Sequence, residues 1–169
     1  MSKISPLAYI DPGAVIGENC EIGPFCFIDK NVVIGDNNVL MNSVTVLYGH
    51  NRQSQTMFAQ LNNFADAEYF AANRDIYIYT PETVYRYEIF AAYPHSSEHL
   101  MLCYDFDDPQ QFSDYFASLT DNVNANYRRE LFPEFGDKVL TLSTCYKQNR
   151  MQRYLVQGVL TEQYTVLQK

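Results

Sequence analysis

Cys145 is the residue of this sequence that is best suited to act as a nucleophile. It ends the predicted strand VLTLSTC at 139–145, and Arg153 follows eight positions later at the start of the next predicted strand. A nucleophilic thiol needs its thiolate stabilised, usually by a nearby imidazolium, and a thioester-forming reaction also needs donors for the developing oxyanion. The pair therefore predicts acyl transfer, with Arg153 as the cation that donates to the oxyanion. Arg150 is the alternative cation, but it falls in the connecting loop.

The histidine that such a thiol needs as its acid and base partner lies far away in the sequence. His50 follows Gly49, which allows a tight turn that exposes the imidazole. His50 and Cys145 are 95 positions apart, so only the fold can bring them together. We expect both side chains and Arg153 to face one groove, with the imidazole near enough to the thiol for an ion pair but beyond hydrogen-bond reach.

The remaining cysteines and histidines are assigned no catalytic role. Cys20 and Cys26 fall at small-residue positions of a repeat and are interpreted as packing residues, and Cys103 ends an apolar run and is interpreted as core. His95 and His99 flank a polar loop and are interpreted as solvated.

Short strands and two helices are predicted to position the candidate residues. Apolar residues at helical spacing span 57–73, and an acidic pair before Pro109 marks the start of a second helix over 109–119. Cys145 then ends one strand and Arg153 begins the next. The strands predicted in this part of the chain are 76–80, 84–93, 100–104, 138–144 and 153–161.

The composition excludes several classes of protein. The 169 residues, 47% of them hydrophobic, are enough for one ordinary domain or two very small ones. A net charge of −8 without any Lys/Arg run argues against nucleic acid as a partner. We predict no signal peptide or transmembrane segment, because no apolar run is long enough. The cysteine spacing fits neither a zinc site nor a disulfide framework, so we predict no metal and no cofactor.

The first 46 residues follow a period of six. This period fits neither a helix nor one long strand, but it fits short strands separated by corners, as in a solenoid. Only three of the 25 aromatic residues precede Val46, so the composition changes there. We therefore predict two segments, 1–47 and 48–169. The repeated apolar positions are Ile4, Ile10, Ile16, Ile22, Ile28, Ile34, Leu40 and Val46.

Residues 4–46 read ISPLAYIDPGAVIGENCEIGPFCFIDKNVVIGDNNVLMNSVTV. This stretch resembles the hexapeptide-repeat acyltransferases, specifically the N-terminus of UDP-N-acetylglucosamine acyltransferase of lipid A synthesis. The resemblance implies a left-handed β-helix and trimers, and hence a homo-oligomer formed through the repeats. That family places its catalytic histidine in a later coil, whereas the first histidine here, His50, follows the last repeat.

Six stretches in the rest of the chain carry a second resemblance: YGHN at 48–51, MFAQL at 57–61, IYIYTPETVYRYEIFAAY at 76–93, the helix-bearing stretch 107–135, VLTLSTC at 139–145 and RYLVQGVL at 153–160. Together they resemble the sortases, and the class B sortases most closely. The family fold is a closed β-barrel of about eight strands, whose first strands are replaced here by the repeats. We therefore predict a mainly β fold: a sortase-like barrel, incomplete at its start, with accessory helices and a short left-handed β-helix-like segment before it.

The sortase resemblance implies roles for five residues. Cys145 is the nucleophile, His50 the acid and base partner, and Arg153 the cation at the oxyanion or substrate, while Ser143 and Thr144 line the peptide groove. The implied reaction cleaves a C-terminal sorting motif of a surface protein and transfers the acyl group to an amine of a cell-wall precursor or a pilin. The implied location is the extracellular face of a Gram-positive membrane.

The two resemblances belong to different cellular settings. Lipid A is made in the Gram-negative cytoplasm, whereas sortases act outside Gram-positive cells, so the two together predict a chimera. Besides an active transpeptidase, two interpretations stay open. One is a UDP-N-acetylglucosamine acyltransferase-like protein without its catalytic histidine, and the other is an inactive chimeric scaffold.

Overall fold

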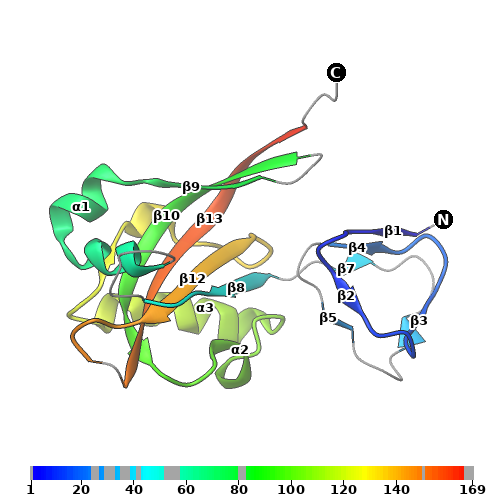
Figure 1. The fold of residues 1–169 in the computed structure, drawn as a ribbon, viewed down its shortest axis with the longest axis horizontal. Helices are drawn as coiled ribbons and strands as arrows, with labels where there is room; N and C mark the ends of the chain where they lie inside the picture. The colour runs from blue at the N-terminus through cyan, green and yellow to red at the C-terminus, as the bar shows by residue number, and fades with distance from the viewer. Residues whose placement is uncertain are drawn as a thin grey trace. The chain divides into compact units, whose positions relative to one another are not determined.

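The computed structural model describes residues 2–23, 27–28, 33–34, 39–40, 43–51, 58–79, 83–149 and 151–165. The chain divides into two compact units, Met1–Asn42 and Ser43–Lys169 (Figure 1). Cys26 and Arg150, for which the sequence predicts a packing role and an alternative catalytic role, lie outside the described residues.

Two-residue strands recur every six residues in the unit Met1–Asn42. Strands three repeats apart pair in parallel, so Ile4 lies opposite Ile22 and Ile10 lies opposite Ile28. Ile22 and Ile28 are buried, because the repeated isoleucines pack against one another inside the three small sheets that result. The strands are β1 (Lys3–Ile4), β2 (Tyr9–Ile10), β3 (Val15–Ile16), β4 (Glu21–Ile22), β5 (Phe27–Ile28), β6 (Val33–Ile34) and β7 (Val39–Leu40), and the sheets are β1-β4-β7, β2-β5 and β3-β6.

A six-stranded sheet forms the centre of the unit Ser43–Lys169. The strand order is β11-β10-β13-β12-β8, and β9 also pairs with β10. The pairings are antiparallel except that β8 runs parallel to β12, which places Tyr48 opposite Ser143. The strands are β8 (Val44–Tyr48), β9 (Asp75–Tyr79), β10 (Thr83–Ser96), β11 (Asn126–Tyr127), β12 (Val139–Cys145) and β13 (Gln152–Thr165).

Short helices surround this sheet, and the longest of them, α3 (Pro109–Ser118), begins as its sequence predicts. The Asp108 carboxylate accepts a hydrogen bond from the Gln111 backbone N–H at 2.8 Å, and Pro109 occupies the first turn, where its missing N–H costs nothing. The other helices are the 3₁₀ helices η1 (Ala59–Ala65), η2 (Leu119–Asp121) and η3 (Arg129–Leu131), and the α-helices α1 (Ala67–Ala72) and α2 (Leu100–Cys103).

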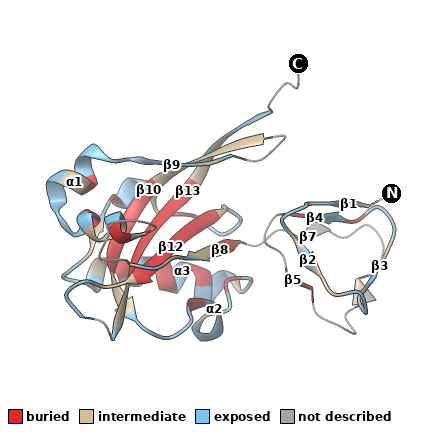
Figure 2. Ribbon diagram, viewed as in Figure 1, coloured by how far each residue is buried: buried red, intermediate tan, exposed pale blue. Residues whose placement is uncertain are grey.

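Both faces of the sheet are covered, and Figure 2 shows the resulting buried centre along β10, β12 and β13. On one face, Phe112 and Phe116 of α3 pack with Leu155 and other buried residues of the sheet. On the other face, residues of η1 and α1, such as Phe70, pack with Val156. Because successive side chains of a strand alternate between the two faces, the side chains at 145 and 153 belong to the face that α3 covers.

The prediction of a mainly β fold with a few helices is confirmed, but two local predictions are wrong. The predicted helix 57–73 is divided, in its described part, into η1 and α1. The predicted strand 100–104 is instead the short helix α2, in which Leu100 is buried while Leu102 is 86% exposed. A continuous apolar run does not distinguish a strand from a helix by its periodicity. Cys103 consequently lies exposed rather than in the core.

The structure also moves the boundary between the segments and opens the predicted barrel. Val46, the last apolar position of the period of six, lies in β8 and pairs with β12. The compact units divide at 42/43, whereas the sequence predicted a boundary at 47/48. Among the described strands, β8 and β11 end the path of the sheet and do not pair with each other. The described part of the sheet is therefore open, because no described strand bridges its two ends.

Candidate active site

Cys145 and Arg153 meet at the ends of two neighbouring strands. They are directly opposed in the antiparallel pair β12–β13, and the Arg153 Nη1 donates to the Cys145 Sγ at 3.2 Å. The hairpin between them brings two residues that are eight positions apart into contact. The sequence predicts that the strand begun by Arg153 lies beside the strand that ends at Cys145, and in the structure the two residues are paired.

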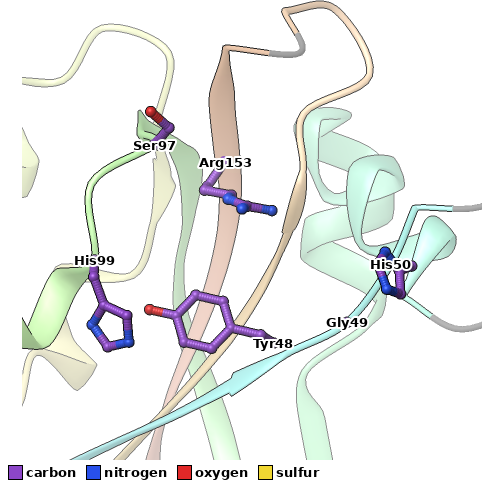
Figure 3. Close-up of a pocket in the computed structure, with 6 residues that line it drawn as sticks. All are labelled: Tyr48, Gly49, His50, Ser97, His99 and Arg153. Carbon is purple, nitrogen blue, oxygen red and sulfur yellow. The ribbon is translucent and has the colours of Figure 1, made fainter.

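His50 and Arg153 line the same pocket. This pocket has a volume of about 340 Å³, and Figure 3 shows His50 on one side of it and His99 on the other, with Arg153 between them. Within the described part of the chain, no hydrogen bond joins the His50 imidazole to the Cys145 thiol. The lining residues are Tyr48, Gly49, His50, Ser97, His99 and Arg153.

The loop that carries His50 is fastened to the end of β12. Gly49 donates its backbone N–H to the Ser143 carbonyl at 2.9 Å, and its own carbonyl accepts the Thr144 hydroxyl at 2.8 Å. The His50 carbonyl accepts the backbone N–H of Phe58 at 3.1 Å. The bond from Gly49 to Ser143 continues the parallel pairing of β8 with β12, and the three bonds together hold the backbone at Gly49 and His50.

Tyr48 and His99 form a wall of the pocket that the sequence did not predict. Their ring centroids are 5.1 Å apart. Burial raises the pKa of Tyr48, against the opposing effects of the Leu100 backbone N–H and of the Arg153 charge. His99 is exposed, yet its ring faces the pocket. The nearness of Tyr48 to His50 in the motif was a usable signal, whereas nothing in the sequence marks His99.

Ser143 and Thr144 are not among the residues that line this pocket, so it gives no support to their predicted role in substrate binding. The two residues are 1% and 0% exposed, because β12 lies inside the sheet with both of its faces covered. Thr144 uses its hydroxyl to hold Gly49, and the Ser143 Oγ has no hydrogen-bond partner among the described residues.

A buried polar network lies on the same face of the sheet as Cys145. Gln157 accepts the Tyr93 hydroxyl at 2.9 Å and donates to the Thr141 hydroxyl at 2.8 Å, and Tyr93 also shares a short hydrogen bond with Tyr115. Burial raises the pKa of both tyrosines.

The described residues contain no group of three possible metal ligands of the His, Cys, Asp or Glu type. No described helix has the length and apolar character needed to span a bilayer.

The fold and the site together define a mainly β protein with a cysteine-based candidate active site. The sequence matches the Sortase domain family over residues 27–161, so the chain belongs to this family. The match begins within the repeats, before the predicted start of the sortase segment at residue 48, and it ends at residue 161.

Similar proteins with names that refer to sortase B support this assignment. Sortase B of Listeria monocytogenes is 28% identical over 128 residues, which cover 73% of this chain and 50% of that protein. A mutant form of Clostridium perfringens sortase B has a similar structure, with a TM-score of 0.63 at 25% identity over 72% of this chain and 58% of that one. The structure of sortase B from Listeria monocytogenes gives a TM-score of 0.59 at 27% identity, over 72% and 66% of the two chains. This chain spans about half the length of the curated relatives that it matches.

Proposed function

We propose that this chain is a class B sortase-type cysteine transpeptidase, in which Cys145 is the nucleophile, His50 the acid and base partner, and Arg153 the cation that stabilises the oxyanion. The 3.2 Å contact between the Arg153 guanidinium and the Cys145 thiol is the observation that carries the proposal. The pocket lined by His50 and Arg153 supports it, because a peptide there would meet the acid and the oxyanion donor together.

The proposed reaction has two acyl-transfer steps. The Cys145 thiolate attacks the carbonyl carbon of the scissile peptide bond, a C–S bond forms, and Arg153 stabilises the charge on the oxygen. The C–N bond then breaks, and the His50 imidazolium gives its proton to the leaving amine. In the second step an acceptor amine attacks the thioester and loses its surplus proton to His50, and the C–S bond breaks to restore the thiolate.

The proposed substrate is the C-terminal sorting motif of a surface protein, and the proposed acceptor is an amine of a cell-wall precursor or a pilin. One similar solved structure is a Staphylococcus aureus sortase B–substrate complex, with a TM-score of 0.60. The reaction would take place on the extracellular face of a Gram-positive membrane. His99 and Tyr48 would then form the wall of the peptide pocket opposite His50.

The test uses a quenched fluorescent sorting-motif peptide with hydroxylamine as the acceptor amine. We expect cleavage with formation of a hydroxamate, and loss of both in Cys145→Ala. Cys103→Ala is the matched control, because Cys103 is an exposed thiol in the same unit and should be dispensable. Cleavage that survives Cys145→Ala would refute the proposal, and the absence of cleavage in every protein would favour an inactive scaffold.

For residues 1–42 we propose a left-handed β-helix of the hexapeptide-repeat type that joins copies of the chain. The parallel pairing of strands 18 residues apart, such as Ile4 with Ile22, supports this proposal. The alternative function, nucleotide-sugar acyl transfer, has less support, because the sequence contains no histidine before His50 to act as its base. Whether the repeats come from a chimera stays a hypothesis.

A further inference from the structure

The backbone carbonyl of Cys145 is held by two side-chain amides from different elements. Asn51, which directly follows His50, donates its Nδ2 to this oxygen at 3.0 Å, and Asn62 of η1 donates its Nδ2 at 3.3 Å. A carbonyl oxygen has two lone pairs, so two donors use its full capacity. The sequence predicted no role for either asparagine.

The rest of the backbone after the thiol is held in a similar way. The backbone N–H of Tyr146 donates to the Gln152 carbonyl at 3.0 Å. The Oδ1 of Asn62 accepts the backbone N–H of Lys147 at 2.7 Å, so the same amide group holds both sides of Tyr146. The peptide group that joins Cys145 to Tyr146 is therefore fixed at its oxygen and at its nitrogen.

This fixation matters because β12 ends at Cys145. The parallel pairing of β12 with β8 runs only from Val139 to Ser143, so on that side Asn51 and Asn62 take the place of a neighbouring strand. The direction of the thiol depends on the backbone of its own residue, and reacting groups must be held to within about 0.5 Å. A shift of this backbone would separate the thiol from Arg153, whose contact is 3.2 Å.

We infer that Asn51 and Asn62 are positioning residues, which hold the Cys145 carbonyl. They thereby keep the thiol in contact with the Arg153 guanidinium, and they keep the His50 loop joined to the end of β12. This inference deepens the proposed function and rests on it only for its effect on turnover. Neither asparagine touches the thiol, and each acts through the backbone of Cys145.

The experiment compares Asn51→Asp and Asn62→Asp with wild type in the full chain. Aspartate has the same shape as asparagine, but its carboxylate cannot donate to a carbonyl and repels it. Asn63→Asp is the matched control. Asn63 is exposed and lies next to Asn62 in η1, so this substitution adds the same charge nearby without removing either hydrogen bond to Cys145. Asn51→Ala and Asn62→Ala remove the donor without adding a charge, and they decide the question if an aspartate variant fails to fold.

The first measurement is the rate of alkylation by iodoacetamide at Cys145, divided by the rate at the exposed Cys103 of the same molecule. We expect this ratio to fall about five- to tenfold in each variant, because each loses a hydrogen bond and weakens the thiol–Arg153 contact. In the double variant the fall should be less than the product of the two single effects, because the two amides share one acceptor. Asn63→Asp should leave the ratio unchanged.

The second measurement separates positioning from stability. With the sorting-motif peptide, kcat should fall five- to tenfold while KM stays within about twofold, because the pocket lining is untouched. A fall in the thermal midpoint with an unchanged or increased alkylation ratio would overturn the inference, since the asparagines would then serve the fold alone. Alkylation needs no turnover, so a protein that never cleaves the peptide still tests the inference, while the failed cleavage counts against the proposed function.

Discussion

Gly49 owes its importance to the close approach of a neighbour. The sequence suggests that this glycine permits a tight turn, but among the described residues only Gly136 is a glycine with a positive φ. A Cβ at position 49 would instead overlap the ring of Phe58. The ring thus packs directly against the backbone that precedes His50, and the space there fits no larger residue.

We therefore predict that Gly49→Ala displaces either the Phe58 ring or the His50 loop. The overlap should lower the free energy of unfolding by roughly 1–3 kcal/mol, and peptide cleavage should fall because His50 moves. Urea unfolding and cleavage rates measure the two effects. Gly136→Ala is the control: it strains the backbone at φ +105°, where no neighbour lies within 4 Å, and should leave cleavage unchanged. Full activity of Gly49→Ala would show that the ring can yield without cost.

Cys103 should react slowly for an exposed thiol. Desolvation, and after it the charge and hydrogen bond of Glu98, raise the pKa of Cys103. A raised pKa leaves less thiolate near neutral pH, so removal of the carboxylate should lower the pKa and speed the reaction. We predict that Glu98→Gln accelerates alkylation of Cys103 at pH 7–8, as measured by mass spectrometry, while Glu68→Gln leaves it unchanged. An unchanged rate in Glu98→Gln would mean that the carboxylate does not act on the thiol.

At the scale of single residues, the sequence predicted the pairing of Cys145 with Arg153 better than it predicted the residues around them. The pairing of Cys145 with Arg153 was predictable, because two strands joined by a short turn form a hairpin. The residues that flank the turn of a hairpin lie opposite each other. The burial of Ser143 was not predictable, because it depends on which strand lies on each side of β12. His99 was missed as a pocket residue for a similar reason, since its position depends on a helix that its sequence did not indicate.

Among the elements, α3 begins with a single side-chain cap, as α1 does with Asp66. The carboxylate of Asp108 pairs the Gln111 N–H, and the helix then covers one face of the sheet with Phe112 and Phe116. Loss of an N-cap side chain costs about 1 kcal/mol. We predict that Asp108→Ala lowers the free energy of unfolding by this amount in a urea titration, whereas Asp121→Ala, at an exposed position, changes it by less than about 0.5 kcal/mol. Equal effects of the two substitutions would contradict the cap.

The strand β8 depends on a distant partner, which local sequence patterns do not reveal. β8 pairs in parallel with β12, which lies about 95 positions further on, so no local pattern connects them. The period of six continues through Val44 and Val46, and only this pairing assigns them to the sheet. By contrast, α3 and the hairpin of β12 and β13 are local structures. The capping residues predicted the helix, and the strand patterns at 138–144 and 153–161 predicted the hairpin.

For the molecule as a whole, the two units have separate interiors. Ile22 and Ile28 form the interior of Met1–Asn42 with partly buried alanines and isoleucines around them, whereas the larger unit has one core on each face of its sheet. A unit of the size of 43–169 buries enough surface to fold as an ordinary domain. The period of six predicted part of the first interior, because Ile22 and Ile28 are buried, whereas Ile4 at an equivalent repeat position is 46% exposed.

The separate interiors lead to a prediction for the shortened chain 43–169. The described contacts that hold His50, Cys145 and Arg153 all come from residues after position 42, so the shortened chain should fold and keep the alkylation ratio of Cys145 to Cys103. Sedimentation velocity should give a monomer, while the full chain forms oligomers if the repeats join copies. The opposite result also has a physical meaning, because the family match begins at residue 27. Loss of Cys145 reactivity in the shortened chain would show that residues 27–42 support the sheet as part of the sortase fold, and that the repeats are more than an appendage.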